Sequence, residues 1–153
     1  MPEIKKLLSD TKFRVGLRTK KDTFKDKDII ILDTLGELSK VYSLVDVAFI
    51  GGSFNSTGGH NPLEATIHNK PVISGPNVKN FKDIYAILER EQAAFVVHDP
   101  NELYMRLEKL FYYEDFYAKT SNNCAKCFEN QQGALDFLSN KLKKILSDNK
   151  NAS

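Results

Sequence analysis

Five short apolar runs alternate with segments of helical periodicity, and this alternation limits the folds open to the chain more than any other feature. The runs cover residues 13–18, 28–32, 46–50, 71–74 and 94–98. Each run is brief and mostly apolar, as expected for strands that are covered by helices on both faces. Between the runs, apolar residues recur at spacings of three and four, which is typical of amphipathic helices. The pattern predicts an α/β domain in three layers, with a parallel sheet covered by helices on both faces.

A single domain is expected over residues 1–146, followed by a polar tail at 147–153. The length of 153 residues is usual for one α/β domain. The last helix of the domain is predicted from an apolar stripe at helical spacing, formed by Leu135, Leu138, Leu142, Ile145 and Leu146. If this stripe is exposed, it is a candidate surface for self-association.

Composition argues against several classes of protein. No apolar run approaches the ~20 residues of a membrane-spanning helix, and no signal peptide is recognisable. A cytoplasmic location is expected because the two cysteines are interpreted as reduced. The net charge of +2 is too small to argue for nucleic-acid binding. Cys124 and Cys127 form a C-x-x-C pair, but the three histidines lie far upstream without zinc-site spacing. We therefore expect reduced cysteines on a helix and no metal site.

Three predicted helix starts carry a capping residue followed three positions later by an acid. The pairs are Thr34 with Glu37, Asn61 with Glu64, and Asp99 with Glu102. Pro62 and Pro100 then occupy the first helical position, where a backbone N–H would have no partner within the helix, so its absence in proline costs nothing. Gly36 would fall in a first helical turn, at a cost of up to ~1 kcal/mol relative to alanine. Close contact between its backbone and a ligand would explain that glycine.

The segment 49–64 is the most informative part of the sequence for function. A predicted buried strand ends in Gly51 and Gly52, a polar loop follows, and Gly58 and Gly59 lead into a capped helix. Glycine lets backbone N–H groups approach a ligand, and a helix N-terminus adds partial positive charge. In a doubly wound sheet such a loop lies at the carboxyl end of a strand, where ligands bind. The sequence therefore predicts a site for a phosphate or a carboxylate.

Several residues near this loop allow two interpretations. Glu64 can close a capping box with Asn61 or accept hydrogen bonds from ribose hydroxyls. Glu37 presents the same choice, and for Glu37 we favour the capping role. His60 is either a donor to an anion or an ordinary loop histidine, and Ser53 offers a hydroxyl. Spacing alone does not separate these alternatives.

Five segments occur in an order that carries more information than any one of them. They read DTLGEL at 33–38, GGS at 51–53, GGHNPLE at 58–64, GP at 75–76 and NF at 80–81. In this order they resemble the C-terminal domain of the 3-deoxy-D-manno-octulosonic acid (Kdo) transferases of lipopolysaccharide assembly. The resemblance runs from about residue 28 to 98, with a helical continuation to about 146, and the GGHNPLE string is its specific part.

The resemblance implies a fold and a donor. Similar proteins have the GT-B architecture, in which two Rossmann-like domains face each other across a cleft, and the C-terminal domain holds CMP-Kdo. No metal or other cofactor is implied. The implied nucleotide-binding residues are Gly36, Glu37, Leu38, Gly52, Ser53, His60, Asn61 and Glu64.

The resemblance also implies what lies elsewhere in such enzymes. The acceptor, a lipid A precursor, and the catalytic base belong to the N-terminal domain, at the cytoplasmic face of the inner membrane. That domain has no counterpart in these residues, so the chain is expected to be about half of an enzyme and inactive in transfer by itself. Of the basic Arg-His-Pro-Glu-Arg segment that opens similar domains, only Pro2-Glu3 corresponds here.

Two alternatives remain open. The same glycine loop and ribose-binding acid would suit a UDP-sugar, in another GT-B transferase or in an epimerase. A non-catalytic scaffolding module would instead bind no nucleotide and would associate with a partner through the stripe from Leu135 to Leu146.

Overall fold

The computed structural model describes residues 2–127, in two compact units that meet in the sequence between Val41 and Tyr42. Each unit is described by itself below. The predicted final helix, its apolar stripe from Leu135 to Leu146 and the tail at 147–153 lie outside the described residues. The single domain expected over residues 1–146 therefore stays a prediction.

The first unit contains a parallel pair of strands. Its elements are α1 (Pro2–Ser9), β1 (Val15–Leu17), the 3₁₀ turn η1 (Arg18–Lys20) and β2 (Ile29–Ile31). β1 and β2 pair in parallel, with Gly16 opposite Ile30. Next to this pair the Arg14 guanidinium and backbone N–H donate to the Asp28 carboxylate at 2.8–3.0 Å. These hydrogen bonds lower the pKa of Asp28 to about 2.

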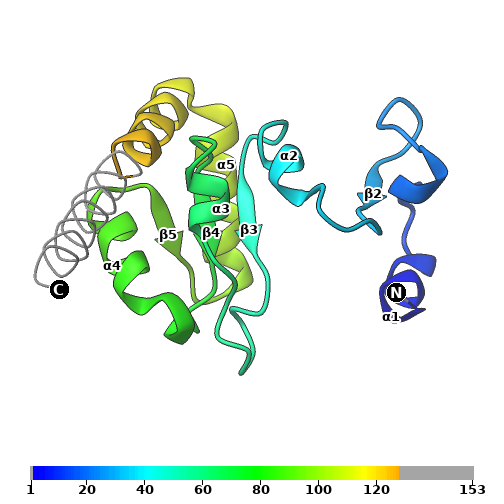
Figure 1. The fold of residues 1–153 in the computed structure, drawn as a ribbon, viewed down its shortest axis with the longest axis horizontal. Coiled ribbons are helices and arrows are strands. Elements are labelled where there is room, and N and C mark those ends of the chain that lie inside the picture. The colour runs from blue at the N-terminus through cyan, green and yellow to red at the C-terminus, as the bar shows by residue number, and fades with distance from the viewer. Residues whose placement is uncertain (1, 128–153) are drawn as a thin grey trace, which may run out of the picture. The chain divides into compact units, whose positions relative to one another are not determined.

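The second unit is built on three parallel strands, β3 (Ala48–Ile50), β4 (Val72–Ser74) and β5 (Ala94–Val96), in the order β3-β4-β5 (Figure 1). The helical elements that accompany them are α3 (Leu63–Thr66), η2 (Lys79–Phe81), α4 (Lys82–Arg90), α5 (Pro100–Tyr112) and a helix over 114–127. α2 (Leu38–Tyr42) spans the division between the units. All five strands fall within the predicted runs, so the α/β class with parallel strands is confirmed.

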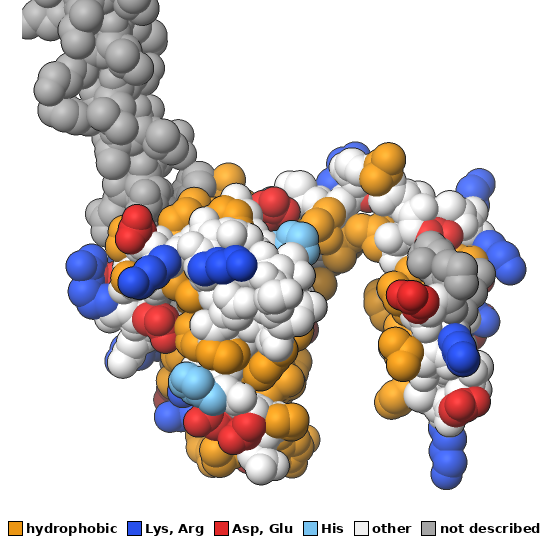
Figure 2. Space-filling view, turned by 90° about the horizontal axis from the view of Figure 1, so that it is seen from below, with side chains coloured by type: hydrophobic (Ala, Val, Ile, Leu, Met, Phe, Trp, Pro, Cys, Tyr) orange, Lys and Arg blue, Asp and Glu red, His pale blue; other side chains and the backbone are white. Residues whose placement is uncertain are grey.

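Helices cover both faces of the three-stranded sheet because successive strand residues point to opposite sides. Val72 packs in a cluster with Ala65 of α3 and with Tyr85 of α4. Its neighbour Ile73 packs in a second cluster with Leu110 of α5. The second unit therefore has the predicted three layers. On its visible face, basic and acidic side chains are interspersed between apolar ones (Figure 2).

The helix over 114–127 crosses the amino end of this sheet. Phe116 packs with the α5 cluster, whereas Cys124 is buried in the cluster on the other face. Between them, the Ser121 hydroxyl donates to the carbonyl of Asn69 at 2.8 Å. The Cys124 thiol lies 3.4 Å from the carbonyl of Lys70, and both carbonyls precede β4. The helix thus supplies donors to carbonyls at the starts of the strands.

The two cysteines are free thiols buried on this helix, as predicted. Within residues 2–127 no group of three or more metal-ligating side chains occurs. None of the helices described in that range combines the length and the apolar character of a transmembrane span.

We predict that both thiols are inert in the folded chain. Burial raises the pKa of Cys124 to about 12, and burial also raises the pKa of Cys127. At pH 8 about one Cys124 in ten thousand would be a thiolate, so a soluble disulfide reagent should react at least ~1,000-fold more slowly than with a free cysteine, whose pKa is about 8.5. Thiol absorbance assays on native and urea-unfolded chain measure this.

An exposed cysteine introduced as Ser9→Cys is the control, because Ser9 lies at the exposed end of α1. It should react within the mixing time while the two native thiols do not. Fast native reaction of two thiols in the unsubstituted chain would contradict the burial described here.

Candidate functional site

The loops that follow β3 and β4 meet at the carboxyl edge of the three-stranded sheet. The first loop runs over 51–61, between β3 and the short helix α3. The second runs over 75–81 and ends in η2. This is the place where a doubly wound sheet binds ligands, and it is where the glycine-rich segment was predicted to lie.

Ser53 joins the two loops through a buried hydroxyl. Its side chain is 1% exposed, donates to the carbonyl of Ile50 at 2.6 Å and accepts from the N–H of Gly75 at 2.8 Å. The Ser53 carbonyl also accepts from the N–H of Asn77 at 2.9 Å. A Cβ on Gly75 would lie 2.7 Å from that carbonyl oxygen, so only glycine allows this approach. In the described structure both hydrogen bonds of the Ser53 hydroxyl go to protein backbone. Its predicted contact with a ligand stays a prediction.

The loop over 51–61 closes on itself through its glycines. The carbonyl of Gly52 accepts from the N–H groups of Gly58 and Gly59, at 3.2 and 3.1 Å. Gly58 has a φ of +90°, in the region that side chains rarely enter. A Cβ there would also lie 2.7 Å from the Cγ of Lys79. Gly58 is therefore required both by its backbone conformation and by the lysine packed against it.

Three side chains of the second loop donate to consecutive carbonyls of the first, and we call them the donor row. Asn77 Nδ2 donates to the carbonyl of Asn55. Lys79 Nζ donates to that of Ser56 at 2.9 Å, and Asn80 Nδ2 to that of Thr57 at 3.0 Å. The carbonyl oxygens at 55–57 are thereby occupied by donors from the donor row.

The backbone N–H groups on the same stretch remain available. Those of Phe54, Asn55 and Ser56 make no hydrogen bond with any residue that the structure describes. Carbonyls that are bonded and N–H groups that are not leave the loop with a net preference for an anion. The sequence did not single out Lys79, because a charged side chain in a turn carries no signal of its own.

Asn61 and Glu64 stand at the start of α3. Asn61 Oδ1 accepts from the N–H of Leu63 at 3.1 Å, so the side chain bonds to the start of α3 as predicted, although the N-cap residue is Pro62 rather than Asn61. Glu64 is exposed and makes no hydrogen bond or ion pair with the residues described between 2 and 127. The reciprocal half of the predicted capping box is therefore absent, and the carboxylate is left to other partners. Burial is the main cause that raises the pKa of Tyr42, and the negative charge of Glu64 is the second cause.

One expectation about this loop needs adjustment, and a second, for His60, stays a prediction. α3 is only four residues long, so its dipole adds little to the anion preference predicted for a helix N-terminus. His60 is exposed, and a Cβ on Gly52 would lie 3.8 Å from its ring. The ring makes no hydrogen bond among the described residues, and its role in binding stays a prediction.

The first unit contains the three predicted site residues Gly36, Glu37 and Leu38. The structure corrects the predicted helical position of Gly36 and the predicted capping role of Glu37. α2 begins at Leu38, so Gly36 precedes the helix and adopts a φ of +78°. That left-handed conformation by itself accounts for the glycine, without a ligand. The Glu37 carboxylate accepts from the Thr34 hydroxyl and from Arg18, at 2.9 Å for Arg18, and both interactions lower the pKa of Glu37.

The predicted capping box at Thr34 is therefore wrong. The Thr34 hydroxyl donates to a carboxylate rather than accepting from a helical N–H, and the first helical bonds go to the backbone carbonyl of Glu37. The predicted contacts of Gly36, Glu37 and Leu38 with a nucleotide stay predictions.

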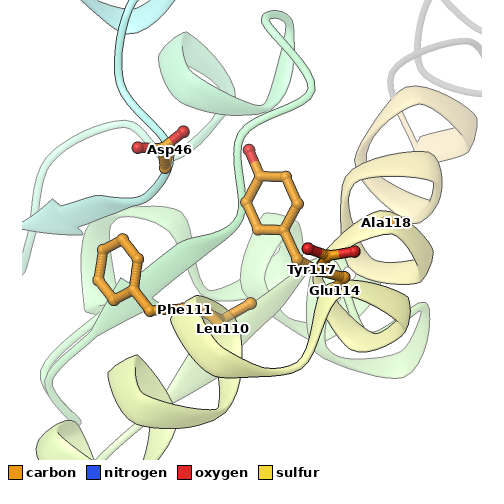
Figure 3. Close-up of a pocket in the computed structure, with 6 residues that line it drawn as sticks. All are labelled: Asp46, Leu110, Phe111, Glu114, Tyr117 and Ala118. Carbon is orange, nitrogen blue, oxygen red and sulfur yellow. The ribbon is translucent and has the colours of Figure 1, made fainter.

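A pocket elsewhere in the second unit is a poor candidate for an anion. It lies at the amino end of β3, opposite the loops just described, and its lining combines apolar side chains with two carboxylates (Figure 3). The lining residues are Asp46, Leu110, Phe111, Glu114, Tyr117 and Ala118. Carboxylates would repel a phosphate, so this pocket does not compete with the glycine loop for that role.

Comparison with known proteins relates the sequence to one group of enzymes. No protein-family model matches the chain. A 3-deoxy-D-manno-octulosonic acid transferase from Haemophilus influenzae is 32% identical over 145 residues, which cover 94% of this chain and 34% of that protein. The transferase of the same name from Aquifex aeolicus is 40% identical over 83 residues, covering 54% of this chain and 24% of that protein. The chain thus spans about a third or less of the length of these relatives.

A solved structure has the same fold. The C-terminal CMP-Kdo binding domain of WaaA from Acinetobacter baumannii matches with a TM-score of 0.77 and 24% identity, over 83% of this chain and 67% of that one. This likeness confirms the predicted Rossmann-like α/β arrangement.

We predict that Ser53→Ala destabilises the second unit. The substitution leaves the buried N–H of Gly75 and the carbonyl of Ile50 without their partner, which costs about 1–3 kcal/mol. Urea unfolding followed by circular dichroism measures the loss. The control is Ser56→Ala, since that side chain is exposed and the change should stay within about 0.5 kcal/mol. Equal stability of the two variants would contradict the role assigned to Ser53.

Proposed function

This chain is related in sequence to the Kdo transferases, and on that premise we propose that it is the domain that binds the CMP-Kdo donor. The observation that carries the proposal is the loop over 51–61. Its carbonyls at 55–57 are bonded to the donor row, while the N–H groups at 54–56 have no partner among the described residues. The exposed Glu64 carboxylate stands just beyond the loop. A nucleoside monophosphate combines the two groups that suit these features, an anionic phosphate and a ribose with two hydroxyl donors.

The phosphate would lie against the backbone of the glycine loop. The N–H groups of Phe54, Asn55 and Ser56, which have no partner among the described residues, offer donors at fixed positions, because the donor row bonds to the carbonyls of the same loop. Such preorganised donors stabilise charge without rearranging when the charge develops. During transfer the CMP leaving group gains negative charge on its phosphate, so the same donors would favour departure.

The ribose would be held by Glu64. An ionised carboxylate accepts hydrogen bonds strongly, and this one has no partner among the described residues. Its position in the first turn of α3 places it directly after the glycine loop. Capping by Asn61 and binding by Glu64 are therefore compatible.

The complete reaction belongs to a longer protein in this proposal. A second domain, facing this one in the GT-B manner, would bring a lipid A precursor and a general base that activates the attacking hydroxyl. The reaction would take place at the cytoplasmic face of the inner membrane, without a metal. By itself the chain of 153 residues is expected to bind donor but not to transfer Kdo.

We predict that the chain binds CMP in preference to UDP, and that Glu64→Ala weakens CMP binding about ten- to a hundredfold. The reason is the loss of hydrogen bonds to a charged acceptor. Isothermal titration calorimetry with each nucleotide measures both effects. Glu108→Ala is the matched control, because Glu108 is an exposed carboxylate on α5, and it should bind CMP like the unsubstituted chain.

Other outcomes would point to the alternatives. A preference for UDP would assign the domain to a UDP-sugar enzyme instead. Absence of binding to either nucleotide would contradict the proposal and favour a scaffolding role.

A further inference from the structure

Lys79 occupies an unusual position beside the glycine loop. Its ammonium group bonds to the Ser56 carbonyl at 2.9 Å rather than to a carboxylate. Its methylene stem passes over Gly58, whose missing side chain would meet the lysine Cγ and Cε at 2.7 and 2.8 Å. Both the methylene stem and the ammonium group of Lys79 therefore lie against the glycine loop.

The charge of Lys79 is not neutralised in the described structure. Two arginines of the second unit have evident partners: Arg90 pairs with Glu91 at 3.0 Å, and Arg106 lies 4.0 Å above the ring of Phe95. Lys79 forms no ion pair with any residue described between 2 and 127, and its side chain is exposed. A neutral carbonyl orients an ammonium group but does not cancel its charge.

The lysine also retains hydrogen-bonding capacity. An ammonium group has three N–H donors, and only one of them is needed by the Ser56 carbonyl. The other two remain for a ligand on the exposed side of the loop. Because the ammonium group is exposed to water and forms no ion pair with the described residues, an anion can approach it without first breaking an ion pair.

We propose that Lys79 is the cation of the site, and that it pairs with the phosphate of the bound nucleotide while its stem keeps the glycine loop in shape. This inference rests on the proposed function, and it adds a residue outside the sequence-predicted set. The lysine and the unpaired N–H groups at 54–56 then act on the same anion, one by charge and the others by fixed direction.

The test separates the charge of Lys79 from its stem. Lys79→Met keeps the unbranched stem over Gly58 and removes the ammonium group, and Lys79→Arg keeps the charge. Calorimetric titrations with CMP and with cytidine, which lacks the phosphate, are compared for each variant at low and at moderate salt. Lys82→Met is the control, because Lys82 is an exposed lysine only three positions further along the chain.

We expect Lys79→Met to weaken CMP binding about tenfold or more, and to leave cytidine binding within about twofold. The salt dependence of CMP binding should also decrease, because one charge contact is removed. Lys79→Arg and Lys82→Met should retain CMP binding close to that of the unsubstituted chain.

Two results would overturn the inference. Equal losses for CMP and cytidine in Lys79→Met would mean that the lysine only shapes the loop. Unchanged CMP binding in Lys79→Met would mean that its charge takes no part. Both of these results leave CMP binding by the unsubstituted chain intact. Absence of CMP binding by the unsubstituted chain would instead mean that the proposed function itself fails, so the two failures are distinguishable.

Discussion

The carboxyl edge of the sheet depends on the buried hydroxyl of Ser53. One oxygen atom satisfies an acceptor at the end of β3 and a donor at the end of β4, in a place where water does not reach either group. Leaving them unpaired would cost more than the bonds themselves contribute, so this connection holds the first residues beyond the two paired strand ends together. The loop after β4 is then held beside the loop after β3, and the donor row reaches its three carbonyls.

The resulting surface has two electrostatic characters. Around residues 54–58, bonded carbonyls, unpaired N–H groups and the Lys79 ammonium favour negative charge. Just beyond the loop, at the start of α3, Glu64 favours hydroxyl donors instead. Glycine makes this division possible, because the positive φ at Gly52 and Gly58 lets the chain turn back without side chains between the loop and a ligand. A nucleotide has the matching division between its phosphate and its sugar.

The sequence predicted the strands because a covered parallel sheet needs continuous apolar runs, and each run contains one strand. It also predicted the cap of α5, where Asp99 accepts from Asn101 and Glu102 and Pro100 follows. It failed at Thr34, because the φ of +78° at Gly36 delays the helix until Leu38. Lys79 was not predicted for a different reason. Its partners, Ser56 and Gly58, lie more than twenty positions earlier, and the tertiary structure brings them together.

The helix over 114–127 has a consequence for how the second unit folds. Its contacts at the amino end of the sheet join residues 52 and 54 positions apart, Ser121 with Asn69 and Cys124 with Lys70. Contacts of such long range form late, because closing long loops costs chain entropy before any contact stabilises them. During synthesis all three strands leave the ribosome before this helix does. The cluster that contains Val72 and Tyr85 therefore lacks its two cysteines in the nascent chain, and it becomes complete only when the helix over 114–127 has emerged.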